Sequence, residues 1–202
     1  MNAALTTERV YERLRTGIMQ RAYLPGERLE PALLAQALLS SMTPVRDALH
    51  LLIGQGLVEP RSGGGFQLPS LDEPALRDMY GWSAQLLAAA MRGWPDPGGL
   101  PASPSWSEPG SIADRASRCF LLIGRRSANG EHGRAIARLN ARLHAVRTIE
   151  IHVIGELEEE MDALESACEA FDRDRLRRLI GAYHRRRDKA AAALVRAMYR
   201  TD

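Results

Sequence analysis

Residues 6–68 carry the pattern that most constrains the fold of this chain: three short amphipathic segments, followed by two extended segments around a run of glycines. In the first segment apolar residues recur at every fourth position, at Val10, Leu14 and Ile18. This spacing places them on one face of a helix. Thr6 and Thr7 are suitable capping residues, so we expect this helix to begin at Glu8.

Two further helices are predicted before residue 57. Pro31 suits the first turn of a short second helix, because proline lacks the amide proton that would be unpaired there. Ser41 or Thr43 can cap a third helix. Its apolar residues follow i, i+3, i+4, i+7 spacing and are expected to face inward: Val45, Ala48, Leu49 and Leu52.

The segment after the third helix predicts a β-hairpin. Residues 57–60 and 66–68 suit two short strands, and residues 61–65 (Arg-Ser-Gly-Gly-Gly) suit a flexible turn between them. Pro60 cannot donate to a neighbouring strand, which restricts the first strand to a sheet edge. Three helices followed by such a hairpin predict a winged helix-turn-helix over residues 1–70.

The rest of the chain, residues 71–202, predicts an all-helical bundle, so the fold class is mainly α. Asp72 caps a long first helix, and residues 94–110 are rich in proline, glycine and serine, which is typical of a flexible loop. Four more helices are expected, at residues 112–127, 131–154, 156–171 and 173–199. The chain of 202 residues is long enough for two such domains.

The third helix and the hairpin carry side chains that suit contacts with DNA. A recognition helix presents its N-terminal residues to base edges in the major groove. Arg46 can contact guanine with two hydrogen bonds, the hydroxyls at the helix start can hold phosphate, and the hairpin can follow the backbone or the minor groove. The candidate DNA-binding residues are Ser41, Thr43, Arg46, His50, Arg61, Ser62, Gly63 and Gly64.

The candidate DNA-binding residues can also have purely structural roles. Ser41 and Thr43 can serve as caps alone, Arg46 can pair with Asp47 or Glu30, and the glycines can form a turn without contacts. The whole chain has a formal net charge of only +2. Residues 1–68 hold seven arginines against six acidic residues. We therefore expect DNA affinity to depend on the placement of charges and to require a homodimer.

These residues resemble the GntR family of bacterial transcriptional regulators. The resemblance rests on Leu24-Pro25-Gly26-Glu27-Arg28-Leu29, on Thr43-Pro44-Val45-Arg46-Asp47-Ala48-Leu49 and on Gly56-Leu57-Val58. The acidic start of the following helix, Leu71-Asp72-Glu73, is similar to the FadR branch with an FCD-type effector domain. The resemblance implies a ligand-responsive homodimer on a near-palindromic operator, with no enzymatic activity.

Two residues of the helix-turn-helix depart from the family pattern. Leu39 stands where the family usually has glycine, and a leucine at a position that often needs a positive φ implies a modified turn. Met42 stands where the family usually has arginine. We therefore expect specificity to depend chiefly on Thr43, Arg46 and the wing.

The helical part keeps only some of the ligands that FCD-type domains use for a divalent metal. Asn140 and His144 match the first pair, with asparagine in place of aspartate, and His184 matches the last ligand. Met161 takes the place of a further histidine. An incomplete set makes zinc, nickel or manganese an open possibility only. The alternative is that Asn140, His144 and His184 are buried polar residues bonded to one another, beside an effector pocket made less polar by Ser83 and Leu87.

The remaining sequence features predict no further functional site. Arginine-rich stretches (134–147 and 173–187) and the acidic run 156–160 predict solvated helix faces. Cys119 and Cys168 are expected to be free thiols in the cytoplasm. The N-terminus lacks a signal-peptide pattern, and no stretch is long and apolar enough to span a membrane. The competing hypothesis is a metal- or ligand-binding helical protein whose winged helix contacts protein.

Overall fold

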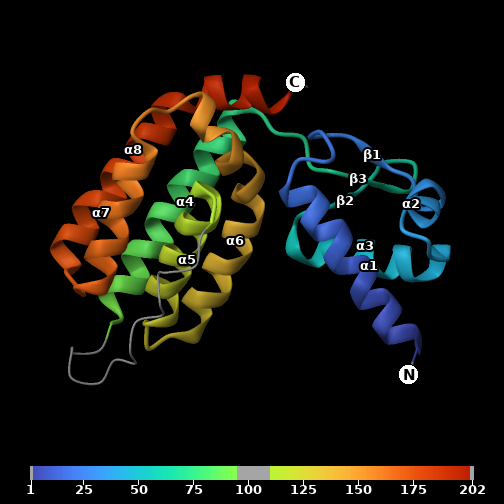
Figure 1. Ribbon diagram of the computed structural model, residues 1–202, viewed down its shortest axis with the longest axis horizontal. Helices are drawn as coiled ribbons and strands as arrows, with labels where there is room; N and C mark the ends of the chain where they lie inside the picture. Colours follow the sequence, from blue (N-terminus) through green and yellow to red (C-terminus); the bar gives the residue numbers. More distant parts are fainter. Residues whose placement is uncertain (1, 95–109, 201–202) are drawn as a thin grey trace. The chain divides into compact units, whose positions relative to one another are not determined.

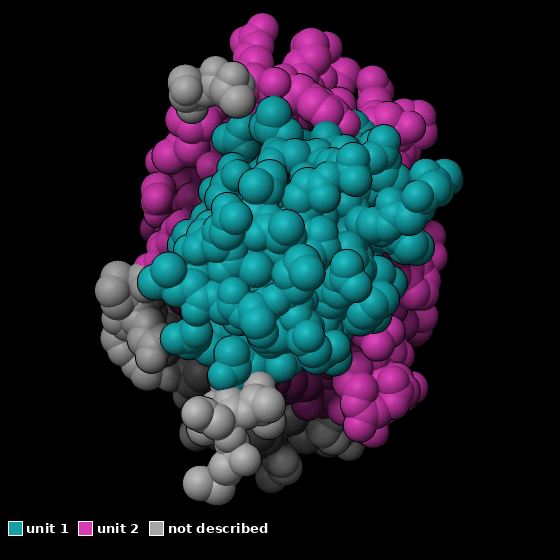
Figure 2. Space-filling view, turned by 90° about the vertical axis from the view of Figure 1, so that its right-hand side faces the viewer, with its two compact units in different colours: residues 1–71, 201 teal, residues 72–200, 202 magenta. Residues whose placement is uncertain are grey.

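The computed structural model describes residues 2–94 and 110–200, with side chains from residue 6 onward. The chain divides into two compact units, the first ending at Leu71 and the second beginning at Asp72, which are coloured separately in Figure 2. Each unit is described by itself. The expected loop over residues 94–110 lies almost entirely outside the described residues.

The first unit is a winged helix-turn-helix, as expected. Its helices are α1 (Asn2–Met19), α2 (Pro31–Ala37) and α3 (Met42–Gln55), and its strands are β1 (Arg28–Leu29), β2 (Glu59–Pro60) and β3 (Phe66–Gln67). The strands form an antiparallel sheet in the order β1-β3-β2, so Pro60 does lie on an edge strand. The core joins the apolar stripes of α1 and α3, namely Val10, Leu14, Ile18, Val45, Ala48, Leu49 and Leu52.

Two details of this unit differ from the sequence-based expectation. Helix α1 begins at Asn2 rather than at Glu8, so Thr6 and Thr7 lie inside the helix and do not cap it. The predicted two-stranded hairpin gains a third strand, β1, which pairs with β3. β1 has only two residues, of which Leu29 is buried, and so short a segment carries no strand periodicity that could be recognised in the sequence.

The second unit is a bundle of helices: α4 (Glu73–Arg92), α5 (Ile112–Arg125), α6 (Gly130–Ile149), α7 (Leu157–Glu169) and α8 (Arg173–Met198). A single 3-10 turn, η2 (Glu150–His152), follows α6. Figure 1 shows α4, α5, α6 and α8 running side by side, with α7 against α5 and α8. No helix of the described residues is long and apolar enough to cross a membrane.

Side-chain caps fix where α4, α5, α6 and α8 begin, whereas α7 begins without one. The carboxylate of Asp72 accepts a hydrogen bond from the amide of Ala75 over 2.8 Å. Ser111 and Asp114 form a reciprocal capping box at the start of α5. Like Asp72, the side chains of Asn129 and Asp172 each accept one backbone hydrogen bond, at the starts of α6 and α8. These residues satisfy amide groups that would otherwise be unpaired at each helix start, and they lie at the breaks that the sequence predicts.

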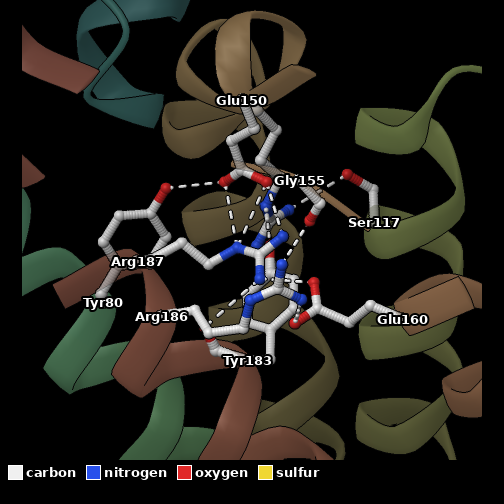
Figure 3. A network of polar contacts seen from close by, with 9 residues as sticks. Tyr80, Ser117, Glu150, Gly155, Glu160, Tyr183, Arg186 and Arg187 are labelled. Atoms are coloured by element: carbon white, nitrogen blue, oxygen red, sulfur yellow. Dashed lines mark hydrogen bonds and ion pairs between the residues drawn. The ribbon is translucent and has the colours of Figure 1, made fainter. Parts of the chain in front are cut away.

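Arg147 and Arg187 correct the expectation that the arginine-rich stretches are solvated faces. Both side chains are fully buried, although Arg134, Arg138 and Arg142 are exposed as expected. Arg187 of α8 donates to the buried carboxylate of Glu150, with an Nη2–Oε2 distance of 2.7 Å. Figure 3 shows this pair, joined by dashed lines, within a wider network of polar contacts.

The same cluster includes part of the acidic run. Arg187 donates over 2.5 Å to Glu160, whose side chain is 8% exposed, and Arg186 donates to the other oxygen of Glu160 over 2.9 Å. Tyr80 of α4 donates to Glu150 over 2.9 Å. Glu160 is therefore a structural ion-pair partner. Glu156, Glu158 and Glu159 are exposed, as the sequence predicted, although Glu158 also accepts from Arg115 over 2.6 Å.

Candidate nucleic-acid interface

Helix α3 presents the residues that the sequence selects for base contact. Ser41 occupies the N-cap position, as expected, but its hydroxyl makes no capping hydrogen bond. Thr43 and Arg46 are exposed, while Val45 and Leu49 hold the other face of the helix in the core. The hydroxyls and the guanidinium are thus displayed at the N-terminal end of α3, where the helix dipole favours an anion.

Within the described residues, Arg46 forms no ion pair with Asp47 or Glu30, the two partners considered for it above. Glu30, the N-cap residue of α2, forms its salt bridge with Arg28 of β1 instead. The Arg28–Glu30 pair is more than a third exposed at both side chains, so it contributes little to stability. The pair neutralises the Glu30 carboxylate without engaging Arg46.

The wing tip is a turn that only glycine allows at low cost. Gly63, Gly64 and Gly65 have φ angles of 95°, 95° and 93°, in the region that side chains disfavour. The turn closes through hydrogen bonds from the Arg61 amide to the Gly65 carbonyl (3.1 Å) and from the Gly64 amide to the Arg61 carbonyl (2.9 Å). Arg61, Ser62 and the three glycines are all exposed.

His50 connects the recognition helix to the wing. Its imidazole ring lies edge-on to Phe66 of β3, with centroids 5.1 Å apart and planes at 74°. Because Phe66 is buried, this contact fixes the side of the wing that α3 meets. His50 itself remains exposed, so its ring is held in place and still accessible.

Helix α3, β1 and the wing together enclose an open hollow of about 480 Å³, lined by Arg28, Glu30, Pro31, Arg46, His50, Gly63, Gly64, Gly65 and Phe66. Four of the predicted DNA-binding residues, Arg46, His50, Gly63 and Gly64, therefore line one concave surface. Sequence reasoning placed Glu30 near Arg46 but missed Arg28, because it missed the strand that carries Arg28. Arg28 brings a second arginine to the hollow.

The turn between α2 and α3 keeps its backbone conformation despite the leucine. Leu39 itself adopts a φ of 49°, and its side chain is 87% exposed. The expected modification of the turn is therefore wrong. The chain instead retains the turn and accepts a strained leucine, at a cost of about 1–2 kcal/mol.

The second candidate site, in the helical unit, is organised around Arg147. Asn140 donates to the carbonyl of Ser117 over 2.9 Å, and its own carbonyl oxygen accepts from Arg147 over 2.9 Å. Arg147 also donates to the hydroxyl of Tyr183 over 3.1 Å. Arg147 lies seven residues after Asn140, close to two turns of the same helix face, which is the sequence signal that could have identified it.

The two histidines make other contacts than the predicted ones. His184 donates through Nδ1 to the carbonyl of Ile180 over 2.8 Å, and its Nε2 has no hydrogen-bond partner among the described residues. Burial, together with the charges of Arg147 and Arg187, lowers the pKa of His184 to about 4. His144 Nε2 lies 3.9 Å from a carboxylate oxygen of Asp114.

These residues do not fit a divalent metal. The oxygen of Asn140 that would serve as a ligand accepts a hydrogen bond from a guanidinium cation, and two arginine charges act on His184. Within residues 2–94 and 110–200 no group of three His, Cys, Asp or Glu side chains is arranged to hold a metal ion. A buried positive environment favours an anion instead.

The cysteines, 49 positions apart in the sequence, meet between α5 and α7. Cys119 and Cys168 are buried free thiols with their sulfur atoms 3.0 Å apart. The contact with Cys168 and burial raise the pKa of Cys119 well above its usual value. A protonated, buried thiol is a weak nucleophile, which favours a packing role for this pair.

Comparison with known proteins identifies the first unit. Residues 6–68 match the family model described as bacterial regulatory proteins, gntR family. Over 70 residues the chain is 31% identical to a Bacillus subtilis (strain 168) protein described as the uncharacterized HTH-type transcriptional regulator YdhC. That alignment covers 35% of this chain and 31% of YdhC, so the chain matches about a third of the curated relative.

Two solved structures share the fold over nearly the whole chain. A putative transcriptional regulator GntR from Rhodococcus sp. RHA1 has a TM-score of 0.68 at 17% identity and covers 96% of this chain and 99% of its own. McbR/YncC of E. coli has a TM-score of 0.62 at 20% identity, with the same coverage of both chains. At these identities the likeness concerns the fold alone.

Proposed function

Because residues 6–68 form a GntR-family helix-turn-helix domain, we propose that this chain is a transcriptional regulator that binds operator DNA through α3 and the wing. The observation that carries the proposal is the open hollow in which Arg46, His50 and the wing glycines meet. An exposed arginine near the start of a recognition helix, beside a glycine tip that permits close approach, suits a DNA groove and its backbone.

Each exposed residue has a distinct part in this proposal. Arg46 contacts guanine in the major groove, and the free hydroxyl of Ser41 binds phosphate with Thr43 at the positive end of α3. His50, held by Phe66, reaches a phosphate further along the groove. The remaining contacts come from the wing, which follows the minor groove or the backbone: Arg61, Ser62, Gly63 and Gly64.

Charge supports a homodimer on a near-palindromic site. The single excess positive charge of residues 1–68 gives one domain little non-specific attraction to DNA. Two domains that bind neighbouring half-sites add their contacts, and two-fold protein symmetry is matched by a palindromic site. Such a regulator works in the cytoplasm, where a bacterial chromosome lies.

The helical unit is proposed to bind a small anionic effector beside Asn140, His144 and His184. Two buried nitrogens support this: Nε2 of His184 and Nη2 of Arg147 both lack hydrogen-bond partners among the described residues. Of the two, only Nη2 of Arg147 is a donor, because the proton of the neutral His184 ring lies on Nδ1. An unpaired buried donor is costly, so a carboxylate that accepts from Arg147 would bind favourably. A ligand that prefers one conformation of the dimer would then change DNA affinity.

Selection of duplexes from a random-sequence pool, followed by gel-shift measurements on the selected duplex, tests the DNA-binding proposal. We expect binding below micromolar protein with a footprint of two half-sites. The exposed arginine Arg13 on α1 provides a charge-matched control, so Arg13→Ala should bind with nearly native affinity while Arg46→Ala does not. Absence of binding at micromolar protein would exclude the proposal and leave the wing as a protein-contact surface.

Thermal unfolding in the presence of succinate or citrate tests the effector proposal separately. A stabilisation that is lost in Arg147→Met but kept in Arg138→Met, an exposed arginine on the same helix, is the expected result. Equal stabilisation of both variants would remove Arg147 from the site. Stoichiometric zinc, nickel or manganese in the purified protein would contradict the conclusion that the donors do not fit a metal.

A further inference from the structure

We propose that Met42 reads the C5-methyl group of a pyrimidine in the major groove, either thymine or 5-methylcytosine. The inference rests on the proposed DNA-binding function and assigns a specificity-determining residue within it. Met42 is the first residue of α3, and 49% of its surface is exposed. A methionine so placed adds little to the core, although apolar residues of the same helix such as Val45 and Leu49 are fully buried.

The helix geometry places Met42 beside Arg46. Because an α-helix turns by about 100° per residue, Arg46 lies about 40° and His50 about 80° around α3 from Met42. All three residues are exposed, so they form one continuous surface stripe. Met42 is four residues, about 6 Å, closer to the N-terminus than Arg46, which corresponds to a step of one to two base pairs along the groove.

The chemistry of methionine limits what it can recognise there. Its thioether has no hydrogen to donate and accepts only weakly, so it cannot replace an arginine that contacts a purine edge. The pyrimidine C5-methyl is the apolar feature that base pairs present in the major groove. Contact with it removes apolar surface from water, whereas contact with an unmethylated cytosine or a guanine would cover polar groups without pairing them.

The flexibility of methionine suits this contact. Three rotatable bonds and a polarizable sulfur allow the side chain to fill an irregular gap beside a methyl group. Leu39, three residues earlier in the turn before α3, is a second exposed apolar side chain at this end of the helix. The Met42 end of the stripe therefore discriminates by apolar contact and the Arg46 end by hydrogen bonds.

Single-atom changes in a selected duplex test the proposal. Each thymine is replaced in turn by deoxyuridine, which removes only the methyl group. We expect binding to weaken about fourfold per methyl at one or two positions in each half-site. These positions should lie next to the guanine for which Arg46→Ala loses its preference. Where the selected base is cytosine, 5-methylcytosine in its place should strengthen binding. The deoxyuridine and 5-methylcytosine replacements together show whether the protein reads the methyl group of thymine or that of 5-methylcytosine.

Variants of Met42 connect that effect to the side chain. Met42→Gln and Met42→Ala should bind thymine and uracil duplexes equally, while Met42→Leu should retain the discrimination. Leu51 is a matched control, because it is 54% exposed on the same helix but about 180° away from Met42. Leu51→Ala should keep the native preference for thymine.

The outcomes separate the two proposals. If the native protein binds no duplex, the proposed function fails and this inference fails with it. If it binds but no deoxyuridine position weakens binding, or if Met42→Gln keeps the same preference, the methyl contact alone is overturned. Loss of self-association in Met42→Gln with an unchanged thymine preference would assign Met42 to a protein contact instead.

Discussion

At the scale of single residues, the surroundings of each arginine determine what it can do. Arg46 is exposed beside the wing, whereas Arg147 and Arg187 are buried among hydrogen-bond partners. The sequence places all three on helices, and the spacing of Arg147 from Asn140 is the one local sign of the difference. Of these three arginines, Arg46 alone has a guanidinium that can reach a base edge.

Replacement of Arg46 by alanine should reduce affinity for the selected duplex by about 1–3 kcal/mol, because it removes a two-hydrogen-bond contact to guanine. The loss should be confined to specific sites, so affinity for random DNA should change far less. Gel-shift titrations of both duplexes measure this. An unchanged affinity for the specific duplex would remove Arg46 from the contact set.

Replacement of His184 should flatten the acid dependence of stability. The folded protein holds His184 at a pKa of about 4, below the ordinary value of 6.5, so the unfolded chain binds its proton first. The stability due to the neutral ring is therefore complete above pH ~6.5 and is lost as the pH falls to about 4, by about 3 kcal/mol.

Urea unfolding at several pH values, followed by tryptophan fluorescence, measures the effect. All three tryptophans lie in the second part of the chain, at positions 82, 94 and 106, so the signal reports the unit that contains His184. His184→Gln should lose less stability than the native chain between pH 6.5 and 4. Parallel curves for the two proteins would contradict the assigned pKa.

At the scale of elements, most helices were predictable and the exceptions have physical causes. Periodic apolar residues and turn signals marked α4 to α8, although α6 ends at Ile149 rather than at residue 154, where the 3-10 turn η2 follows it. The start of α1 was misjudged because threonines at positions 6 and 7 are good caps but are also tolerated inside a helix. Strand β1 forms only because β3 offers it a partner, which is a long-range effect.

The candidate sites were predictable to the extent that each residue's role is local. The exposed face of α3 follows from helical spacing, and the wing glycines follow from their composition. Asn140 contacts Arg147 on its own helix and Ser117 of α5, and His184 contacts Ile180 one turn earlier on α8, so only the Ser117 contact depends on packing between helices. A buried arginine requires a polar partner elsewhere in the fold, so the sequence of its own segment does not predict that it is buried.

The turn before α3 gives a prediction at this scale. Leu39→Gly should stabilise the first unit by about 1 kcal/mol, because glycine adopts the positive φ of 49° without steric strain. Hydrogen exchange of the α2 and α3 amides measures the change, since the first unit holds no tryptophan. Faster exchange in the variant would show that the leucine side chain stabilises the turn.

At the scale of the whole molecule, the buried ion pairs hold the helical unit together. Arg187 of α8 connects Glu150 after α6 with Glu160 of α7, and Tyr80 of α4 donates to the same Glu150. The Arg187–Glu150 pair thus joins four parts of the unit: α8, the 3-10 turn η2, α7 through Glu160 and α4 through Tyr80. Because the charges are buried, the loss of one leaves the others unpaired.

Arg187→Met should therefore destabilise the second unit by about 3–5 kcal/mol, measured by urea unfolding with tryptophan fluorescence. The exposed Arg185 serves as the control, and Arg185→Met should change stability by less than about 0.5 kcal/mol. Glu150→Gln combined with Arg187→Met should recover part of the loss, because fewer charges remain buried without a partner. Equal effects of the Arg185 and Arg187 substitutions would contradict the buried network.

The central claim, that this chain is a DNA-binding regulator whose α3 and wing contact an operator, is tested most directly by the salt dependence of binding to the selected duplex. The account predicts sub-micromolar affinity that falls at least about a hundredfold between about 50 and 200 mM salt, as phosphate contacts by two domains require. It also predicts a footprint of two half-sites one helical turn apart. Binding that is absent at micromolar protein, or that does not change with salt, would contradict it.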